Sequence, residues 1–156
     1  MDWQVRLATP EDAEAISTVV VAALSESNAR DYPAEVIDRV RQNFSPRAVS
    51  RMIGERRVHV ATIDARVVAT ASLDGSVVRS VFVHPQNQGQ GVGRSLMAAV
   101  FEAARSAGLK ELQVPSSITA EGFYAGLGFR RIRDEFHGTE RSIVMQRDLQ
   151  RRVDVG

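Results

Sequence analysis

The chain has 156 residues, of which 44% are apolar and 25% charged, which suits one globular domain with a substantial core. Twenty basic residues stand against 19 acidic ones, and the arginines lie beside acids along the chain, so no nucleic-acid footprint is predicted. The longest apolar run is far shorter than a membrane span, and Met1-Asp2-Trp3-Gln4 opens no signal peptide, so a cytoplasmic protein is expected.

The first part of the chain predicts a strand followed by helices. Residues 3–8 alternate in polarity as an edge strand does. Thr9-Pro10-Glu11-Asp12 supplies a capping hydroxyl, a proline at the first helical position and acids in the first turn, and apolar residues at helical spacing follow to Leu24. Further helices are expected over 34–43 and from Ser45-Pro46 to about Gly54.

From Val58 the apolar period becomes two, which predicts strands. They are expected at 58–63, 67–73 and 77–83, with hairpin turns at 64–66 and 74–75. The helix that follows a glycine-rich loop ends at Gly108 and has one apolar face, formed by Val92, Leu96, Met97, Val100, Phe101 and Ala104.

The C-terminal part predicts alternating elements. A short strand at 112–114 is broken by Pro115, and a helix is expected over 119–127. Residues 129–135 and 141–147 form a closing hairpin. The outline is that of an α/β protein with six or seven strands.

The loop between residues 83 and 95 carries the most specific signal. An apolar strand runs into His84-Pro85 and then into glycines at 89, 91 and 93, and an amphipathic helix follows. Glycine leaves backbone N–H groups accessible, and a helix start adds the positive end of its dipole, so the segment predicts a phosphate or pyrophosphate site rather than a merely flexible turn. Arg94 breaks a dinucleotide fingerprint, and the Gly-Lys pair of a Walker loop is missing.

Two motifs give a family resemblance. Gln88-x-x-Gly91-x-Gly93 resembles the acyl-coenzyme A signature of the GNAT N-acetyltransferase superfamily. Phe123-Tyr124-Ala125-Gly126-Leu127-Gly128-Phe129, preceded by Ser117-x-x-Ala120, resembles that family's Phe-Tyr-x-x-x-Gly-Phe motif. The resemblance covers nearly the whole chain but weakens before residue 55. It implies a single N-acetyltransferase domain over 1–150 with a short tail at 151–156.

The resemblance also implies a fold and a cosubstrate. The fold is a mixed, mostly antiparallel sheet of six or seven strands with helices on both faces, splayed at a wedge that receives acetyl-coenzyme A. The pantetheine arm would pair with strand backbone near Val83, whose N–H would act as an oxyanion donor, and the pyrophosphate would rest on the glycine loop. The residues implied to bind the cosubstrate are Val81, Phe82, Val83, Gln88, Gly89, Gln90, Gly91, Val92, Gly93, Arg94, Ser95 and Ser117.

Two of these side chains have open alternatives. Arg94 either pairs with phosphate or extends into solvent. Ser117 either contacts the pantetheine arm or caps the following helix, and one role does not exclude the other.

Tyr124 is implied to be the general acid that serves the departing coenzyme A thiolate. A phenol of pKa ~10 is a weaker acid than a thiol of ~8.5, so full proton transfer is uphill by roughly 2 kcal/mol. A hydrogen bond to the developing thiolate, with proton uptake from water, is sufficient. The alternative is a core aromatic beside Phe123.

The base that would deprotonate an amine is not evident. Many relatives have an acid on the strand before the loop, whereas this chain has Val77-Val78-Arg79-Ser80-Val81 there. Asp74, His84 and Glu121 are candidates that would act through water. The histidines are too scattered to predict a metal site, so no metal is expected.

The acceptor pocket carries no motif. Family architecture suggests a lining drawn from Asp31, Tyr32, Phe44, Phe136 and His137. Because cysteine is absent, direct acetyl transfer to an amine of a small molecule or peptide is the simpler scheme. The acceptor, a longer acyl donor and a homodimer stay open, and a non-catalytic acyl-coenzyme A-binding or regulatory module is the alternative function. No nucleic-acid or membrane partner is expected.

Overall fold

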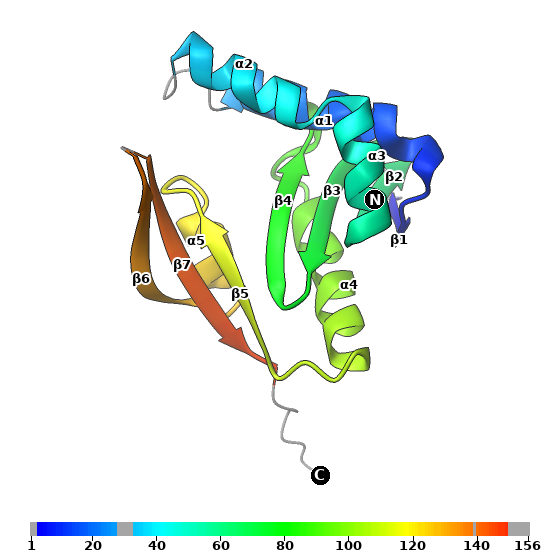
Figure 1. Cartoon of the computed structure of the whole chain (residues 1–156). Coiled ribbons are helices and arrows are strands. Elements are labelled where there is room, and N and C mark those ends of the chain that lie inside the picture. The colour runs from blue at the N-terminus through cyan, green and yellow to red at the C-terminus, as the bar shows by residue number, and fades with distance from the viewer. Residues whose placement is uncertain (1–2, 28–32, 139, 150–156) are drawn as a thin grey trace. The chain divides into compact units, whose positions relative to one another are not determined.

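The computed structural model describes residues 3–27, 33–138 and 140–149 (Figure 1). Its strands form one seven-stranded, mostly antiparallel sheet in the order β1-β2-β3-β4-β5-β7-β6, flanked by helices, which confirms the predicted fold class. The elements are β1 Trp3–Leu7, η1 Pro10–Asp12, α1 Ala13–Ser27, α2 Ala34–Asn43, α3 Pro46–Glu55, β2 Arg57–Ile63, β3 Arg66–Asp74, β4 Val77–Val83, η2 Pro85–Asn87, α4 Val92–Ser106, β5 Glu111–Ser116, α5 Glu121–Gly126, β6 Arg130–His137 and β7 Glu140–Asp148.

Most sequence-based boundaries agree with these elements, and one interpretation was wrong. Pro115 was expected to end its strand, but β5 continues through it to Ser116, with Pro115 opposite Val144. Proline lacks the backbone N–H, so a strand tolerates it where that donor is not needed by a neighbour. In the described residues no helix is long and apolar enough to cross a membrane.

The chain divides into two compact units, which are described separately. The first comprises residues 1–72 and 80–100. In its core, α1 packs on β2 and β3 and on the buried Val49 of α3. The central members are Ile16, Val19, Val20, Val58, Val60 and Val67. Burial of this apolar surface provides the driving force for folding the unit.

The second unit comprises residues 73–79 and 101–156. Its strands β5, β7 and β6 lie side by side in that order (Figure 1). β7 pairs antiparallel with both neighbours, and β4 contributes one parallel pair, Val77 with Gln113, where Gln113 N donates to Ser76 O at 3.0 Å. Leu112, Ile143 and Met145 are fully buried in this unit.

Candidate functional site

A turn held by hydrogen bonds follows the end of β4. His84 N donates to Val68 O at 2.8 Å, which ties the end of β4 to β3. The imidazole Nδ1 of His84 accepts from Gln86 N at 3.1 Å and so caps η2. A neutral His84 therefore carries its proton on Nε2, and its acceptor nitrogen is already used in holding the turn.

The glycine loop follows, and its three glycines differ. Gly89 and Gly91 have φ of 78° and 94°, a left-handed conformation that favours glycine. Gly93 instead lies in the first turn of α4 and is buried. Two of the three glycines therefore shape the turn, and the third belongs to the helix that follows.

Backbone donors accumulate at the start of α4. In the described part of the chain, the first N–H after Gln88 with a carbonyl partner belongs to Ser95, which donates to Gly91 O at 3.1 Å. The first N–H groups of an α-helix have no partner within the helix, and the 15-residue α4 adds the positive end of its dipole. Gln88 to Gly91 are exposed, so the loop can present these donors to an anion.

Gln88 has a local structural role that its motif position did not reveal. Its Nε2 donates to Val83 O at 3.2 Å, which joins the loop to the end of β4. The carbonyl of Val83 thus already accepts one hydrogen bond from within the chain. The side chains of Val81, Phe82 and Val83 are partly exposed.

A backbone irregularity in β4 was not predicted. Ser80 has a φ of 57°, which is unusual for a non-glycine residue inside a strand and breaks the regular alternation there. Its hydroxyl accepts from Arg56 Nη1 at 3.4 Å, and so does that of Ser72. The sequence offers no glycine, asparagine or aspartate at this position that would signal the feature.

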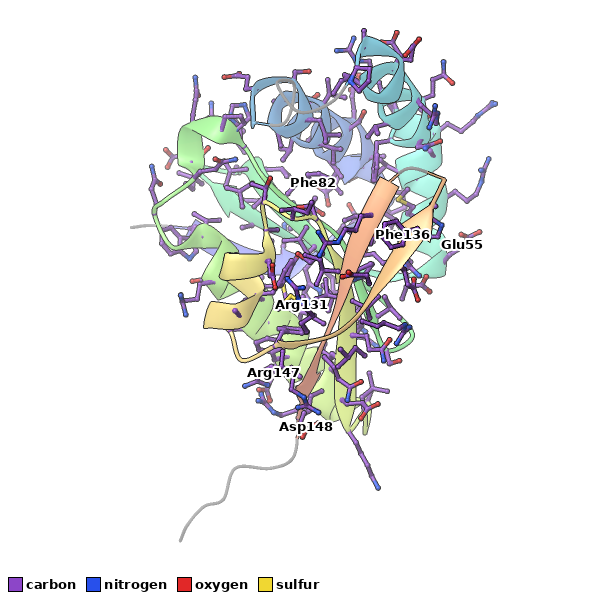
Figure 2. The ribbon with its side chains drawn as sticks, turned by 90° about the vertical axis from the view of Figure 1, so that its left-hand side faces the viewer. Glu55, Phe82, Arg131, Phe136, Arg147 and Asp148 are labelled. Atoms are coloured by element: carbon purple, nitrogen blue, oxygen red, sulfur yellow. The ribbon has the colours of Figure 1, made fainter. Side chains whose placement is uncertain are left out.

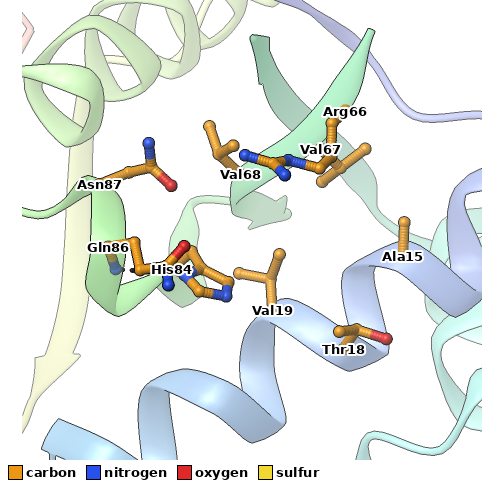
Figure 3. A pocket seen from close by; sticks show the side chains of 9 residues that line it. All are labelled: Ala15, Thr18, Val19, Arg66, Val67, Val68, His84, Gln86 and Asn87. Carbon is orange, nitrogen blue, oxygen red and sulfur yellow. Dashed lines mark hydrogen bonds between the residues drawn. The ribbon is translucent and has the colours of Figure 1, made fainter. Parts of the chain in front are cut away.

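A cavity of about 200 Å³ lies beside the turn that leads into the loop (Figure 3). Val19 of α1 and Val67 and Val68 of β3 form apolar parts of its wall, and His84 lies among them. Gln86 and Asn87 line its other side. The cavity belongs wholly to the first unit.

Tyr124 lies in the second unit, on α5, and is buried with only 6% of its surface exposed. Its ring makes edge-to-face contacts with Phe123 and Phe129, at centroid distances of 5.2 and 5.6 Å. Burial raises the pKa of Tyr124, so the phenol stays protonated at neutral pH. The structure therefore supports a core contribution by the ring and leaves the hydroxyl able to donate a hydrogen bond.

Gly128 ends α5 with a φ of 96°. Phe129 N donates to Tyr124 O and Gly128 N to Ala125 O, a Schellman arrangement. Arg147 of β7, labelled in Figure 2, donates from Nε to Leu127 O at 2.8 Å. A Cβ on Gly128 would lie 2.9 Å from that Nε, so the motif glycine is required by both conformation and space.

Gly128→Ala should lower the free energy of unfolding by about 2–3 kcal/mol, from left-handed strain and a disturbed Arg147 hydrogen bond. At the size of this chain that shifts Tm by roughly 5–10 °C. The Tm of the variant, measured by calorimetric melting, checks this prediction. Gly122→Ala, inside α5 with open space around it, is the matched control and should be neutral or stabilising. Equal Tm values for the two variants would contradict the account.

Ser117 caps the turn before α5, because its hydroxyl accepts from Ala120 N at 3.2 Å. Ser117 thus closes this turn rather than capping α5 itself, whose N-cap is Ala120 and has no side-chain cap hydrogen bond among the described residues. A contact of Ser117 with a pantetheine arm stays a prediction. Arg94 is exposed on α4, and its side chain likewise keeps its predicted alternatives.

The candidate bases have partners. Asp74 pairs with Arg79 across the β3–β4 turn at 3.3 Å. Both carboxylate oxygens of Glu121 accept from Arg131, at 2.9 to 3.1 Å. These carboxylates are thus held in ion pairs rather than presented alone.

His59 and the possible metal ligands complete the description of the titratable groups. His59 is buried, and its Nδ1 has no partner among the described residues. Burial lowers the pKa of His59, and the positive charge of the nearby Arg57 lowers it by a smaller amount. No cluster of three or more potential metal ligands occurs in the described residues.

The residues expected to line an acceptor pocket are distributed as follows. Phe44 belongs to the first unit and packs edge-to-face on Phe82 with centroids 5.6 Å apart. Phe136, 64% exposed, and His137 are on β6 of the second unit. Asp31 and Tyr32 lie outside the described residues.

The mixed sheet and its strand–glycine loop–helix segment have the arrangement that the family resemblance predicted. The chain belongs to the GNAT acetyltransferase family, because the family model described as an acetyltransferase (GNAT) domain matches residues 28–145.

Individual relatives are distant in sequence. The chain is similar to the uncharacterized N-acetyltransferase YafP of Escherichia coli K12, at 24% identity over 85% of this chain and 84% of that protein. A GCN5-related N-acetyltransferase structure from Rhodopseudomonas palustris gives a TM-score of 0.87 at 23% identity, covering 95% and 96% of the two chains. The PaiA N-acetyltransferase of Thermoplasma acidophilum, solved with coenzyme A, gives 0.83 at 17% identity, covering 95% and 99%.

Proposed function

We propose that this protein is an N-acetyltransferase that moves an acetyl group from acetyl-coenzyme A directly to an amine of a small molecule or peptide. The observation that carries the proposal is the exposed glycine loop at the start of α4, where the backbone N–H groups from Gly89 to Arg94 have no carbonyl partner among the described residues. Family membership and the coenzyme A complex of a relative support the choice of cosubstrate.

In this proposal the loop binds the pyrophosphate and β4 supports the pantetheine arm. The proposed donors are the backbone N–H groups from Gln88 to Arg94, of which that of Gln88 also donates to Pro85 O at 3.5 Å. Helix-start donors of this kind favour anions. Backbone groups of Val81 and Val83 would pair with the arm, and the N–H near Val83 would polarise the thioester carbonyl. Phe82, Val92, Ser95 and Ser117 would line the path of the cosubstrate.

The proposed reaction is a direct transfer. The lone pair of the neutral amine attacks the thioester carbon, and the carbonyl oxygen takes up the negative charge near Val83 N–H. Collapse of the tetrahedral intermediate breaks the C–S bond. The nitrogen, which became positively charged on attack, loses one proton to water. The products are the acetylated amine and coenzyme A thiol. The chain has no cysteine that could carry an acyl group in between.

Tyr124 would act on the leaving group as a hydrogen-bond donor. Its raised pKa makes complete proton transfer to a thiolate of pKa ~8.5 more unfavourable than for an ordinary tyrosine. The same shift keeps the phenol protonated across the working pH range, so the donor is always present. The thiolate then takes its proton from water.

Amine deprotonation is proposed to need no dedicated protein base. Asp74 and Glu121 are in ion pairs with arginines, and His84 Nδ1 accepts a backbone N–H. We therefore expect kcat/KM to rise with pH toward the pKa of the acceptor amine, ~10.4 for a primary alkylamine. Asp74→Asn, His84→Gln and Glu121→Gln should each cost less than about tenfold in kcat/KM.

A pH–rate profile of each variant tests this expectation. Thermal melting serves as the control, since removal of a partner from an ion pair or cap can lower stability without touching the chemistry. A loss near 10³-fold at one position, together with disappearance of the acidic limb, would identify a base and contradict the proposal.

The candidate bases are already held in ion pairs or a hydrogen bond, and this favours one second function, a non-catalytic acyl-coenzyme A-binding or regulatory module. Such a module would bind coenzyme A saturably and release no thiol when amines are added. Thiol release from acetyl-coenzyme A across a panel of alkylamines, polyamines, amino acids and peptide N-termini separates the two functions. Amine-dependent release supports the transferase, and saturable binding without release supports the module.

A further inference from the structure

The chain's single tryptophan lies against the glycine loop. A Cβ built on Gly91 would be 3.6 Å from Cη2 and 3.9 Å from Cζ2 of Trp3. Apart from the neighbours of Gly91 in the chain, Trp3 is the only described residue with atoms within 4 Å of that position. The edge of the indole therefore occupies the side of the loop on which a side chain would project.

Trp3 is itself held in place. It is the first residue of β1 and pairs with Ile63 of β2, and the ladder continues to Leu7 opposite His59. Arg6, on the same strand, forms two hydrogen bonds to Asp12 at 2.8 and 3.0 Å, which fasten β1 to η1, directly before α1. The half-buried indole is thus carried by an anchored strand.

The loop needs such support for a physical reason. Glycine populates positive and negative φ about equally, so Gly91 has little intrinsic preference for its φ of 94°. A loop that must be ordered by its ligand binds that ligand more weakly than one ordered beforehand. A fixed aromatic edge on the side of Gly91 where a Cβ would project excludes the loop conformations that would enter that space.

We propose that Trp3 is a positioning residue for the cosubstrate, which holds the loop at Gly91 in the conformation that presents its N–H donors to a pyrophosphate. The inference rests on the proposed function, since it takes this loop as the coenzyme A site. It adds a residue that neither signature motif contains and that lies almost ninety positions before the loop in the sequence.

The test is a set of calorimetric titrations with coenzyme A. Trp3→Ala should weaken binding by about tenfold, whereas Trp3→Phe, which keeps an aromatic edge, should stay within about threefold. Leu7→Ala, on the same strand but away from the loop, is the matched control and should bind as the wild type does. In turnover assays Trp3→Ala should raise KM for acetyl-coenzyme A and leave kcat at saturation unchanged.

A second measurement needs no substitution. Because Trp3 is the sole tryptophan, its emission should change on addition of coenzyme A and saturate at the calorimetric Kd. Binding by calorimetry without any emission change, or equal affinity of wild type and Trp3→Ala, would overturn the inference and leave the proposed function standing. Absence of coenzyme A binding by the wild type would overturn both.

Discussion

Tyr124→Phe should lower kcat by about 10²-fold or more while leaving the affinity for acetyl-coenzyme A nearly intact. The change removes only the hydroxyl, and the ring contacts with Phe123 and Phe129 remain. Loss of the hydrogen bond to the departing thiolate acts on the transition state rather than on ground-state binding. Steady-state kinetics with saturating acceptor, together with calorimetric titration, measure the two effects separately.

The leaving group provides the internal control for this prediction. With a donor whose thiol has a lower pKa, the thiolate needs less stabilisation and the effect of Tyr124→Phe should shrink. A melting curve like that of the wild type establishes that the fold is retained. Wild-type turnover in a stably folded variant would leave Tyr124 with its core role alone.

Gly91→Val should weaken acetyl-coenzyme A binding by at least about tenfold, because a branched residue does not adopt the φ of 94° found there. Direct obstruction of the pyrophosphate by the valine side chain would be another cause of such a loss. The structure instead directs the Cβ toward the indole of Trp3, at ordinary contact distance. The loss is therefore expected to come from the altered backbone, and calorimetry measures it.

Gly75→Val is the matched control for this substitution. Gly75 also has a positive φ, of 63°, but it lies in the β3–β4 hairpin turn with open space around it. Gly75→Val should lower the free energy of unfolding through the same kind of backbone strain and leave coenzyme A affinity unchanged. Equal affinity of Gly91→Val and the wild type would remove the loop from the cosubstrate site.

The sequence was most informative where local chemistry decides the structure. Apolar residues at helical spacing mark a helix, so α2 and the apolar face of α4 lie where they were predicted. The family motifs likewise indicated the glycine loop and the Tyr124 segment. In both cases the deciding residues are neighbours in the chain.

Features that depend on residues far apart in the chain were not predicted. Trp3, on an edge strand, lies beside the loop at Gly91, and the restriction at Gly128 comes from Arg147 on a later strand. The left-handed Ser80 and the strand that continues through Pro115 also depend on their neighbours in the sheet. Local propensity contains no information on such partners. The one usable signal for Trp3 was that it is the only tryptophan, on a predicted edge strand.

The most direct test of the central claim counts both products in one reaction. With acetyl-coenzyme A and an acceptor from the amine panel, the account predicts that coenzyme A thiol and N-acetylated amine appear in equal amounts. It also predicts that the intact mass of the protein stays unchanged, because the transfer is direct. Saturable coenzyme A binding with no acetylated amine from any acceptor class, or thiol release matched only by acylated protein, would contradict direct transfer to an amine.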